Sequence, residues 1–277
     1  MALIIGSVAY AGLKSRTPTN VATGQSTTSS TSTTVAGETP TNTAPPITVT
    51  PIAAGERITG DTPCPRIDGS ERRVTSFEKA PPQCFPADQG YDIVIKTTKG
   101  DIKGTIGNPE AAEIVNNFLV LAAYHFYDGM PVDFARERGW WEAGSKVEGT
   151  DGIVSPGYSV PYTGPEQIMT SIQLAMALDP AGSKNVTSRL IVGFGEFSNE
   201  IPPGTPTIGI ILDGVDASQG VGKAGTASGA VTELNTILSI TITEGQKITK
   251  NAGSSTTTVP GTPDATTPSS SSDTLAR

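Results

Sequence analysis

The stretch GNPEAAEIVNNFLVLAAYHFYDG, residues 107–129, decides the fold because it carries a full set of helix signals. Asn108 suits the N-cap, since its side-chain oxygen can accept a free backbone N–H, and Pro109 fits the first helical position. Glu110 and Glu113 fall in the first turn, near the positive end of the helix dipole. Apolar residues follow at spacings of three and four: Ile114, Val115, Phe118, Leu121 and Ala122. We predict a helix whose apolar face is covered by other elements.

Immediately before this helix, residues 91–106 read as two β-rich runs around a turn at residues 98–101, which predicts a hairpin packed on the helix. Further apolar or β-branched runs predict strands at residues 172–177, 188–193, 207–214 and 236–243. A short second helix is expected at residues 215–221.

Composition limits the number of domains and the classes of partner. Both ends of the 277-residue chain are poor in apolar residues, which leaves a single domain within the usual size range. The net charge of −8 argues against a nucleic-acid groove, because such a groove needs a basic face. With His125 as the sole histidine, we expect neither a Ser-His-Asp triad nor a clustered metal site, and no cofactor. We expect His125 itself to end the helix and interact with its dipole.

The N-terminus carries an apolar run, residues 2–13, followed by Lys14 and Arg16. This run is too short to span a bilayer as a helix, which takes about 20 residues. Residues 1–16 therefore read either as part of a signal anchor whose start lies upstream, which we favour, or as the remnant of a signal peptide. A buried core helix is the weaker alternative, because the adjoining segment does not have a globular composition.

Low-complexity segments flank the domain. Residues 17–57 are dominated by Thr, Ser, Pro, Ala and Gly, and cannot bury enough apolar surface to offset chain entropy. We interpret them as a disordered linker and residues 246–277 as a disordered, Ser- and Thr-rich tail. Between them we place an N-terminal extension at residues 58–90 and the barrel domain at residues 91–245.

Cys64 and Cys84 are the only cysteines, and they flank a polar, proline-rich loop. Secreted chains keep disulfides, so we expect these two residues to form one. Closing a loop of this length should stabilise the fold by about 3 kcal/mol on the chain-entropy model. The alternative, a redox pair, lacks the C-x-x-C spacing.

Several motifs together resemble the cyclophilin-type peptidyl-prolyl isomerases, in the actinobacterial, membrane-anchored form. They are TKGDI at residues 98–102, VNNFLVLA at 115–122, YHFYDG at 124–129, PGY at 156–158, LAMA at 174–177 and ILSITITE at 237–244. The pattern around Cys64 and Cys84 also looks like the segment that precedes the barrel in that family. The resemblance covers roughly residues 60–245. It implies a mainly β fold, a closed eight-stranded antiparallel barrel capped by two helices.

The resemblance also implies where the chemistry should lie. These isomerases use a Phe-His-Arg triplet after the Tyr-Asp-Gly turn, then an aromatic residue and a Gln. Aligned without gaps, the triplet falls on Val132, Asp133 and Phe134, and the later pair on Gly139 and Glu142, so the arginine is absent. A register with two inserted residues aligns Phe134 and Arg136 with the triplet and Trp141 with the pocket aromatic, but then the Gln becomes Gly144.

Further pocket positions come from the later motifs. Ser188 stands in place of a Gln and Leu190 in place of a Phe, while Met176 and Ala177 belong to the LAMA block. Leu178 replaces an Asn, and Thr205 stands where a histidine would be. We therefore predict Arg136 as the catalytic residue of the gapped register. The predicted substrate-binding residues are Phe134, Trp141, Glu142, Met176, Ala177, Ser188 and Leu190.

Trp140 and Trp141 are adjacent, so in a strand one should point inward and the other outward. Core packing is the simpler interpretation of both, and stacking of one on a ligand is the more specific one.

Most pocket positions are substituted, so three functions stay open. The first is an extracytoplasmic, membrane-tethered member of this family whose isomerase activity is weak or lost. The second is a binding module for proline-containing or extended segments of cell-envelope proteins. The third is an active isomerase that uses Arg136 and Trp141. We expect a bacterial, extracytoplasmic monomer that contacts the membrane through its N-terminal segment.

Overall fold

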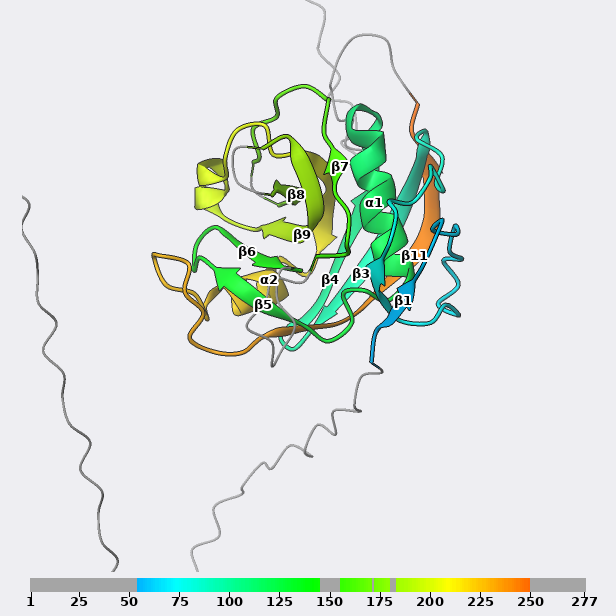
Figure 1. Ribbon diagram of the computed structural model, residues 1–277. Coiled ribbons are helices and arrows are strands. Elements are labelled where there is room, and N and C mark those ends of the chain that lie inside the picture. Colours follow the sequence, from blue (N-terminus) through cyan, green and yellow to red (C-terminus); the bar gives the residue numbers. More distant parts are fainter. Residues whose placement is uncertain (1–53, 145–154, 171, 180–182, 250–277) are drawn as a thin grey trace, which may run out of the picture. The chain divides into compact units, whose positions relative to one another are not determined.

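The computed structural model describes residues 54–144, 155–170, 172–179 and 183–249 (Figure 1). The predicted anchor, most of the predicted linker and nearly all of the predicted tail lie outside these residues. Among the described residues, no helix combines the length and apolar character needed to cross a bilayer.

The predicted hairpin and helix are both present. Strands β3 (Gln89–Thr97) and β4 (Gly100–Ile106) pair in register from Thr97↔Gly100 to Tyr91↔Ile106. Asn108 caps the next segment, because its Oδ1 accepts a hydrogen bond from the Glu110 N–H at 3.1 Å. That segment begins as a 3-10 turn, η1 (Pro109–Ala111), and continues as helix α1 (Ala112–Ala123). The cap was predicted correctly, but the α-helix proper starts three residues after Pro109.

Eight strands close into an antiparallel barrel, as the family resemblance implies. The remaining strands are β5 (Met130–Ala135), β6 (Trp140–Ala143), β7 (Val160–Pro161), β8 (Gln173–Leu178), β9 (Asn185–Gly193), β10 (Thr207–Asp213) and β11 (Thr236–Lys247). The order is β6-β5-β11-β3-β4-β10-β8-β9, and β9 pairs again with β6 through Glu142↔Ile191. Strand β7 is left out of this ring: it pairs with the start of β9, through Val160↔Val186. Because the first and last strands of this order pair with each other, the barrel has no unpaired edge strand.

Two helices pack on the barrel (Figure 1). Helix α1 contacts β11, β7 and β9, whereas helix α2 (Val215–Gly222) contacts β4 and β6. Both predicted helices are therefore found. A second 3-10 turn, η2 (Glu196–Glu200), follows β9.

The core fills the barrel and continues under α1. Phe118, Leu121, Tyr127 and Trp141 are fully buried within it. The polar atoms of this core are paired: Tyr127 Oη donates to the Ser188 carbonyl at 3.0 Å, and Tyr158 Oη donates to Asn117 Oδ1 at 2.8 Å. Burial raises the pKa of both phenols, so they stay neutral inside the fold.

The N-terminal extension carries the predicted disulfide, Cys64–Cys84. Strands β1 (Glu56–Ile58) and β2 (Val74–Phe77) pair in parallel, so β1 takes up the last residues of the segment predicted as linker. Asn116 on α1 holds the Cys84 end, since its Oδ1 accepts from the N–H groups of Cys84 at 2.7 Å and Phe85 at 3.1 Å. The extension is thus attached to the same helix that covers the barrel.

Candidate functional site on the outside of the barrel

The candidate site lies on the barrel exterior over β5, β6, β8 and β9, which we call the outer face. Alternation along β6 sends Trp141 and Ala143 into the main core. Trp140 belongs instead to a second apolar cluster, separate from that core. Its buried members are Trp140, Met169, Ala175, Ala177, Ile191 and Ile201, with Phe134 packed against them.

An aromatic and cationic stack forms one side of the outer face. The rings of Phe134 and Trp140 stack with centroids 5.5 Å apart and planes inclined by 24°. The guanidinium carbon of Arg136 lies 5.3 Å from the centroid of the Trp140 ring, within cation–π distance. Arg136 Nη1 is also ion-paired with Glu200, at the end of η2. The predicted arginine therefore lies beside an aromatic surface, but a carboxylate already binds it.

A second ion pair lies next to this stack. Glu142 is largely buried; its Oε1 accepts a hydrogen bond from Trp140 Nε1 at 3.1 Å, and its Oε2 is ion-paired with Arg189. Glu142 and Arg189 come from paired strands, because β6 and β9 align Glu142 with Ile191. Such a half-buried pair holds both side chains in one place, since removing either partner would leave a charge without compensation.

The structure divides the predicted site residues between two sides of the barrel wall. Arg136, Phe134, Glu142 and Ala177 lie together on the outer face. Trp141, Met176, Ser188 and Leu190 are fully buried on the inner side. Ser188 Oγ, for example, donates to the Gly144 carbonyl at 2.7 Å, and Trp141 Nε1 donates to Ser218 Oγ at 2.9 Å. These four residues cannot reach a peptide on the outer face, so Trp140 replaces Trp141 as the aromatic residue of the candidate site.

Three residues of the outer face carry a signal in the sequence that the family alignment passes over. Trp140 is the member of the tryptophan pair that points outward when Trp141 points into the core. Arg189 and Ile191 alternate with Ser188 and Leu190 along β9. A shift of one residue in the family alignment would therefore have assigned Arg189 and Ile191 to the outer face. Met169 has no such signal, because it lies in a segment without helix or strand pattern.

Two irregular segments cover the apolar part of the outer face. Ile201 follows η2 and Met169 follows β7, and both side chains are almost completely buried against β6, β8 and β9. The apolar surface around Trp140 is therefore occupied by side chains of the chain itself.

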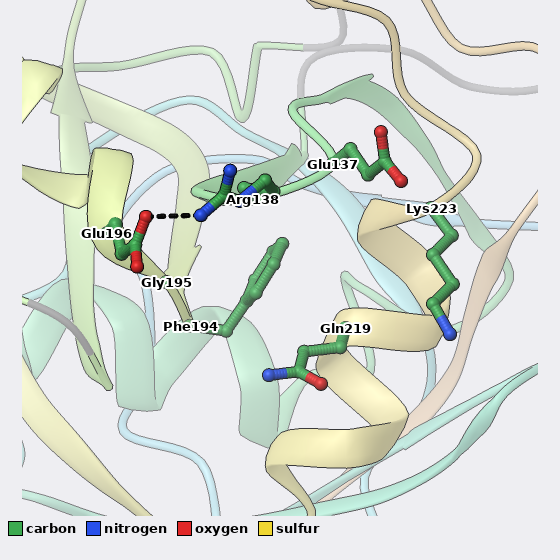
Figure 2. A pocket seen from close by; sticks show the side chains of 7 residues that line it. All are labelled: Glu137, Arg138, Phe194, Gly195, Glu196, Gln219 and Lys223. Carbon is green, nitrogen blue, oxygen red and sulfur yellow. Dashed lines mark hydrogen bonds and ion pairs between the residues drawn. The ribbon is translucent and has the colours of Figure 1, made fainter.

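A pocket of about 300 Å³ borders this site at the β5–β6 turn (Figure 2). Figure 2 shows the Phe194 ring between the Arg138–Glu196 ion pair, 2.5 Å long, and the side chains of Gln219 on α2 and Lys223 at its end. Glu137 adds a second carboxylate to the lining. Charges of both signs line the pocket, so it favours neither anions nor cations.

The residues that the structure describes hold no group of three or more His, Cys, Asp and Glu side chains able to bind a metal ion. His125, the one histidine, lies beyond α1; its Nδ1 lies 3.0 Å from Asp128 Oδ2 and its Nε2 lies 3.3 Å from the Gly69 carbonyl. It belongs to the contact between the helix end and the N-terminal extension, away from the outer face.

Comparisons with known proteins gave matches among solved structures. No protein-family model and no curated protein matches the chain. Two of the solved structures to which it is similar are of a cyclophilin-type peptidyl-prolyl isomerase. A Cryptosporidium parvum cyclophilin-type peptidyl-prolyl cis-trans isomerase aligns at 20% identity over 57% of this chain and 99% of its own, with a TM-score of 0.46. The same enzyme in the presence of the dipeptide Ala-Pro aligns at 18% identity over 56% of this chain and 99% of its own, also with a TM-score of 0.46.

Proposed function

We propose that this chain is an extracytoplasmic cyclophilin-like protein that binds proline-containing or extended segments of cell-envelope proteins, with isomerase activity that is weak or lost. The proposal depends on one observation: the guanidinium of Arg136 lies on Trp140 at the outer face, but is ion-paired with Glu200 while Met169 and Ile201 cover the adjacent apolar surface.

Prolyl isomerisation sets the chemical requirements. The barrier to rotation is about 18–20 kcal/mol and arises from amide resonance. A guanidinium that donates a hydrogen bond to the prolyl nitrogen weakens this resonance, provided that the proline ring sits in an apolar slot beside it. Here the guanidinium would have to leave Glu200, and the ring would have to displace buried side chains. Both steps raise the cost of reaching the transition state.

Peptide binding has weaker requirements, which the outer face meets better. Phe134 is half-buried and stacks on the buried Trp140, so a proline ring can pack on the part of Phe134 that stays accessible. Glu142 and Arg189 offer charged groups beside it, although they satisfy one another in this structure. A peptide can use the aromatic surface without requiring the precise alignment that catalysis demands.

Location and oligomeric state belong to the same proposal. The Cys64–Cys84 disulfide is compatible with an oxidising compartment, and the apolar run at residues 2–13 suits a membrane anchor. We propose a monomer tethered to the outer side of the cell membrane. Fractionation of the native cells tests this, because a protein recovered in the cytosol with reduced cysteines would contradict it.

A protease-coupled assay on a Xaa-Pro peptide tests the activity. We expect excess protein to leave the cis-to-trans rate close to its uncatalysed value. Peptide-dependent chemical-shift changes should nevertheless appear and should weaken in Trp140→Ala. Leu234→Ala, an exposed position outside the outer face, serves as the control.

A rate that rises with protein concentration and falls in Arg136→Ala would instead make the chain an active isomerase. Absence of any binding at millimolar peptide would remove the peptide-binding function.

A further inference from the structure

Met169 is buried on the outer face, whereas its neighbour Ile168 points into solvent. Its side chain is 1% exposed, whereas that of Ile168 is 71% exposed. The Met169 methyl group reaches Gly193 on β9 so closely that a Cβ added to Gly193 would lie 2.8 Å from it. Gly193 pairs with Trp140. Met169 therefore inserts directly beside the aromatic stack.

The surface beneath Met169 suits an unbranched apolar side chain. Ala175 and Ala177 on β8 are small, and Ile191 and Ile201 close the sides. Small residues leave room for a flexible chain that adapts to the remaining space, as methionine does. In this structure the chain's own Met169 fills that room.

Hydrogen bonds hold the segment that carries Met169, residues 162–170, at both ends and in the middle. At the ends, the Tyr162 N–H donates to the Lys184 carbonyl at 2.6 Å and the Thr170 N–H donates to Gln173 Oε1 at 2.7 Å. Gln167 is the main anchor: its Oε1 accepts a hydrogen bond from the Thr207 N–H at 2.9 Å and another from the Thr207 hydroxyl. Its carbonyl accepts from the Gly204 N–H at 3.0 Å, and Tyr162 Oη donates to the Pro165 carbonyl at 2.7 Å. Tyr162 is buried in the main core, but residues 166–170 have no helix and no strand pairing, so this part can detach without breaking the barrel.

The backbone is strained just after this segment. Ile172 has φ of 60°, in the left-handed region, and a β-branched side chain makes that conformation unfavourable. Residues held in such conformations cluster at switch regions and ligand clamps. The Ile172 carbonyl accepts a hydrogen bond from the Ile211 N–H on β10 at 2.8 Å, which helps to hold this conformation.

We propose that the outer face around Trp140, Ala175, Ala177 and Ile191 binds an unbranched apolar side chain of an extended, proline-containing peptide, and that Met169 competes for this place within the chain. The proposal rests on the function proposed above, because it uses the same face. The competing segment shows the chemistry of the ligand: it is irregular, contains Gly164 and Pro165, and presents a methionine. A peptide binds only the fraction of molecules in which the segment is released, so the apparent affinity is reduced by that fraction.

A synthetic peptide with the sequence of residues 162–170, YTGPEQIMT, provides the probe. We expect it to bind the full-length double variant Gln167→Ala/Met169→Ala at least roughly tenfold more tightly than the wild type, because the anchor and the competitor are both removed. Gln167→Ala/Ile168→Ala is the matched control, since it loses the same anchor but keeps Met169. The same peptide with Asp in place of Met should not bind any of the three proteins.

Equal affinity of the two double variants for the peptide would overturn the proposal, and so would binding of the Asp peptide. If Gln167→Ala/Met169→Ala loses its cooperative unfolding transition, Gln167→Ala alone is used: it should bind the Met peptide more tightly than the wild type, and unchanged affinity would count against the proposal. The outcomes also separate the two proposals. Wild type that binds Xaa-Pro peptides without any gain in the variants leaves the function standing and removes the competition by Met169. A gain for the Met peptide in the variant, while neither protein binds Xaa-Pro peptides that lack methionine, keeps the competition by Met169 and removes the recognition of proline-containing segments.

Discussion

Ser218 on α2 illustrates, at the scale of single residues, how the barrel interior depends on paired polar atoms. Its hydroxyl accepts the Trp141 indole N–H at 2.9 Å, and both side chains are fully buried. We predict that Ser218→Ala lowers the free energy of unfolding by about 1–3 kcal/mol, because the indole N–H then has no partner away from water. Denaturant unfolding of both proteins measures the difference. Ser228→Ala, at an exposed position, should change the stability little, and equal losses in the two variants would contradict the role of the pair.

The buried carboxyl group of Asp128 lowers the stability of the fold as the pH rises, whereas an exposed, ion-paired carboxylate raises it. Burial raises its pKa, and the neighbouring His125 and Arg73 offset only part of this shift. Between the unfolded value of about 3.9 and the raised folded value, the folded state therefore holds more protons than the unfolded state. The contribution of Asp128 is fully present at low pH and is lost as the pH rises through the folded pKa.

We therefore predict that Asp128→Asn becomes more stable relative to the wild type as the pH rises from about 4 toward 7. The Asn side chain keeps an acceptor for His125 but does not titrate, so the difference between the two proteins isolates the carboxyl group. Unfolding free energies at several pH values measure it. A difference that stays constant, or that shifts in favour of the wild type with rising pH, would refute the raised pKa.

At the scale of elements, the sequence predicted the local helices and strands, but it did not predict which side of the barrel wall each site residue lies on. Helix α1 and the β3–β4 hairpin follow from capping residues, apolar spacing and a turn, all of which act over a few neighbours. Which side of a strand faces the core depends on its partners. In β5 the register shifts between Val132, which lies in the main core, and Phe134, which packs on the outer-face cluster, so simple alternation does not relate these two residues.

The same reason explains why both residues predicted on β9, Ser188 and Leu190, lie on the inner side. Strand β9 pairs Leu190 with Met176 on β8 and with Ala143 on β6, and these three residues all face the core. That arrangement puts Arg189 and Ile191 outside. The parity is fixed only when the ring closes, which is a property of the assembled sheet and not of any one stretch of sequence.

The loop after α2 positions Phe134 on β5, and this contact supports the aromatic stack. Gly229 has φ of 88°, and a Cβ there would lie 1.8 Å from Phe134 Cε2. We predict that Gly229→Ala moves the Phe134 ring off Trp140 and weakens binding of Xaa-Pro peptides. Gly60→Ala is the matched control, because Gly60 has φ of 81° but nothing within 4 Å of an added Cβ.

Comparing Gly229→Ala with Gly60→Ala distinguishes the effect of backbone strain on stability from the effect of losing the Phe134–Trp140 stack on peptide binding. Both should be destabilised by about 1 kcal/mol or more, since alanine is unfavourable at positive φ. Only Gly229→Ala should also change peptide binding, as measured by titration of the folded proteins. Unchanged binding in Gly229→Ala would mean that the stack of Phe134 on Trp140 does not contribute to the site.

At the scale of the whole molecule, the N-terminal extension and the barrel form one unit through α1. Asn116 Nδ2 donates to the Pro82 carbonyl at 2.9 Å, and Tyr124 Oη donates to the Pro63 carbonyl at 3.0 Å. Phe77 in β2 packs against Tyr124 and Tyr158, with ring centroids 5.6 and 5.9 Å away. These contacts keep the extension on the helix, whereas the disulfide joins two residues within the extension itself.

The disulfide should therefore contribute stability without determining the fold. Cys64 and Cys84 are 20 positions apart, and a loop of this size should stabilise by about 3 kcal/mol, chiefly by restricting the unfolded chain. We predict that Cys64→Ser/Cys84→Ser unfolds cooperatively at lower denaturant concentration and binds Xaa-Pro peptides like the wild type, because the extension's contacts lie on α1 and not on the outer face. Denaturant unfolding and peptide titration of the same preparations measure both quantities. Peptide binding that falls together with stability would show that the extension also shapes the outer face, since the barrel strands themselves are unchanged in this variant.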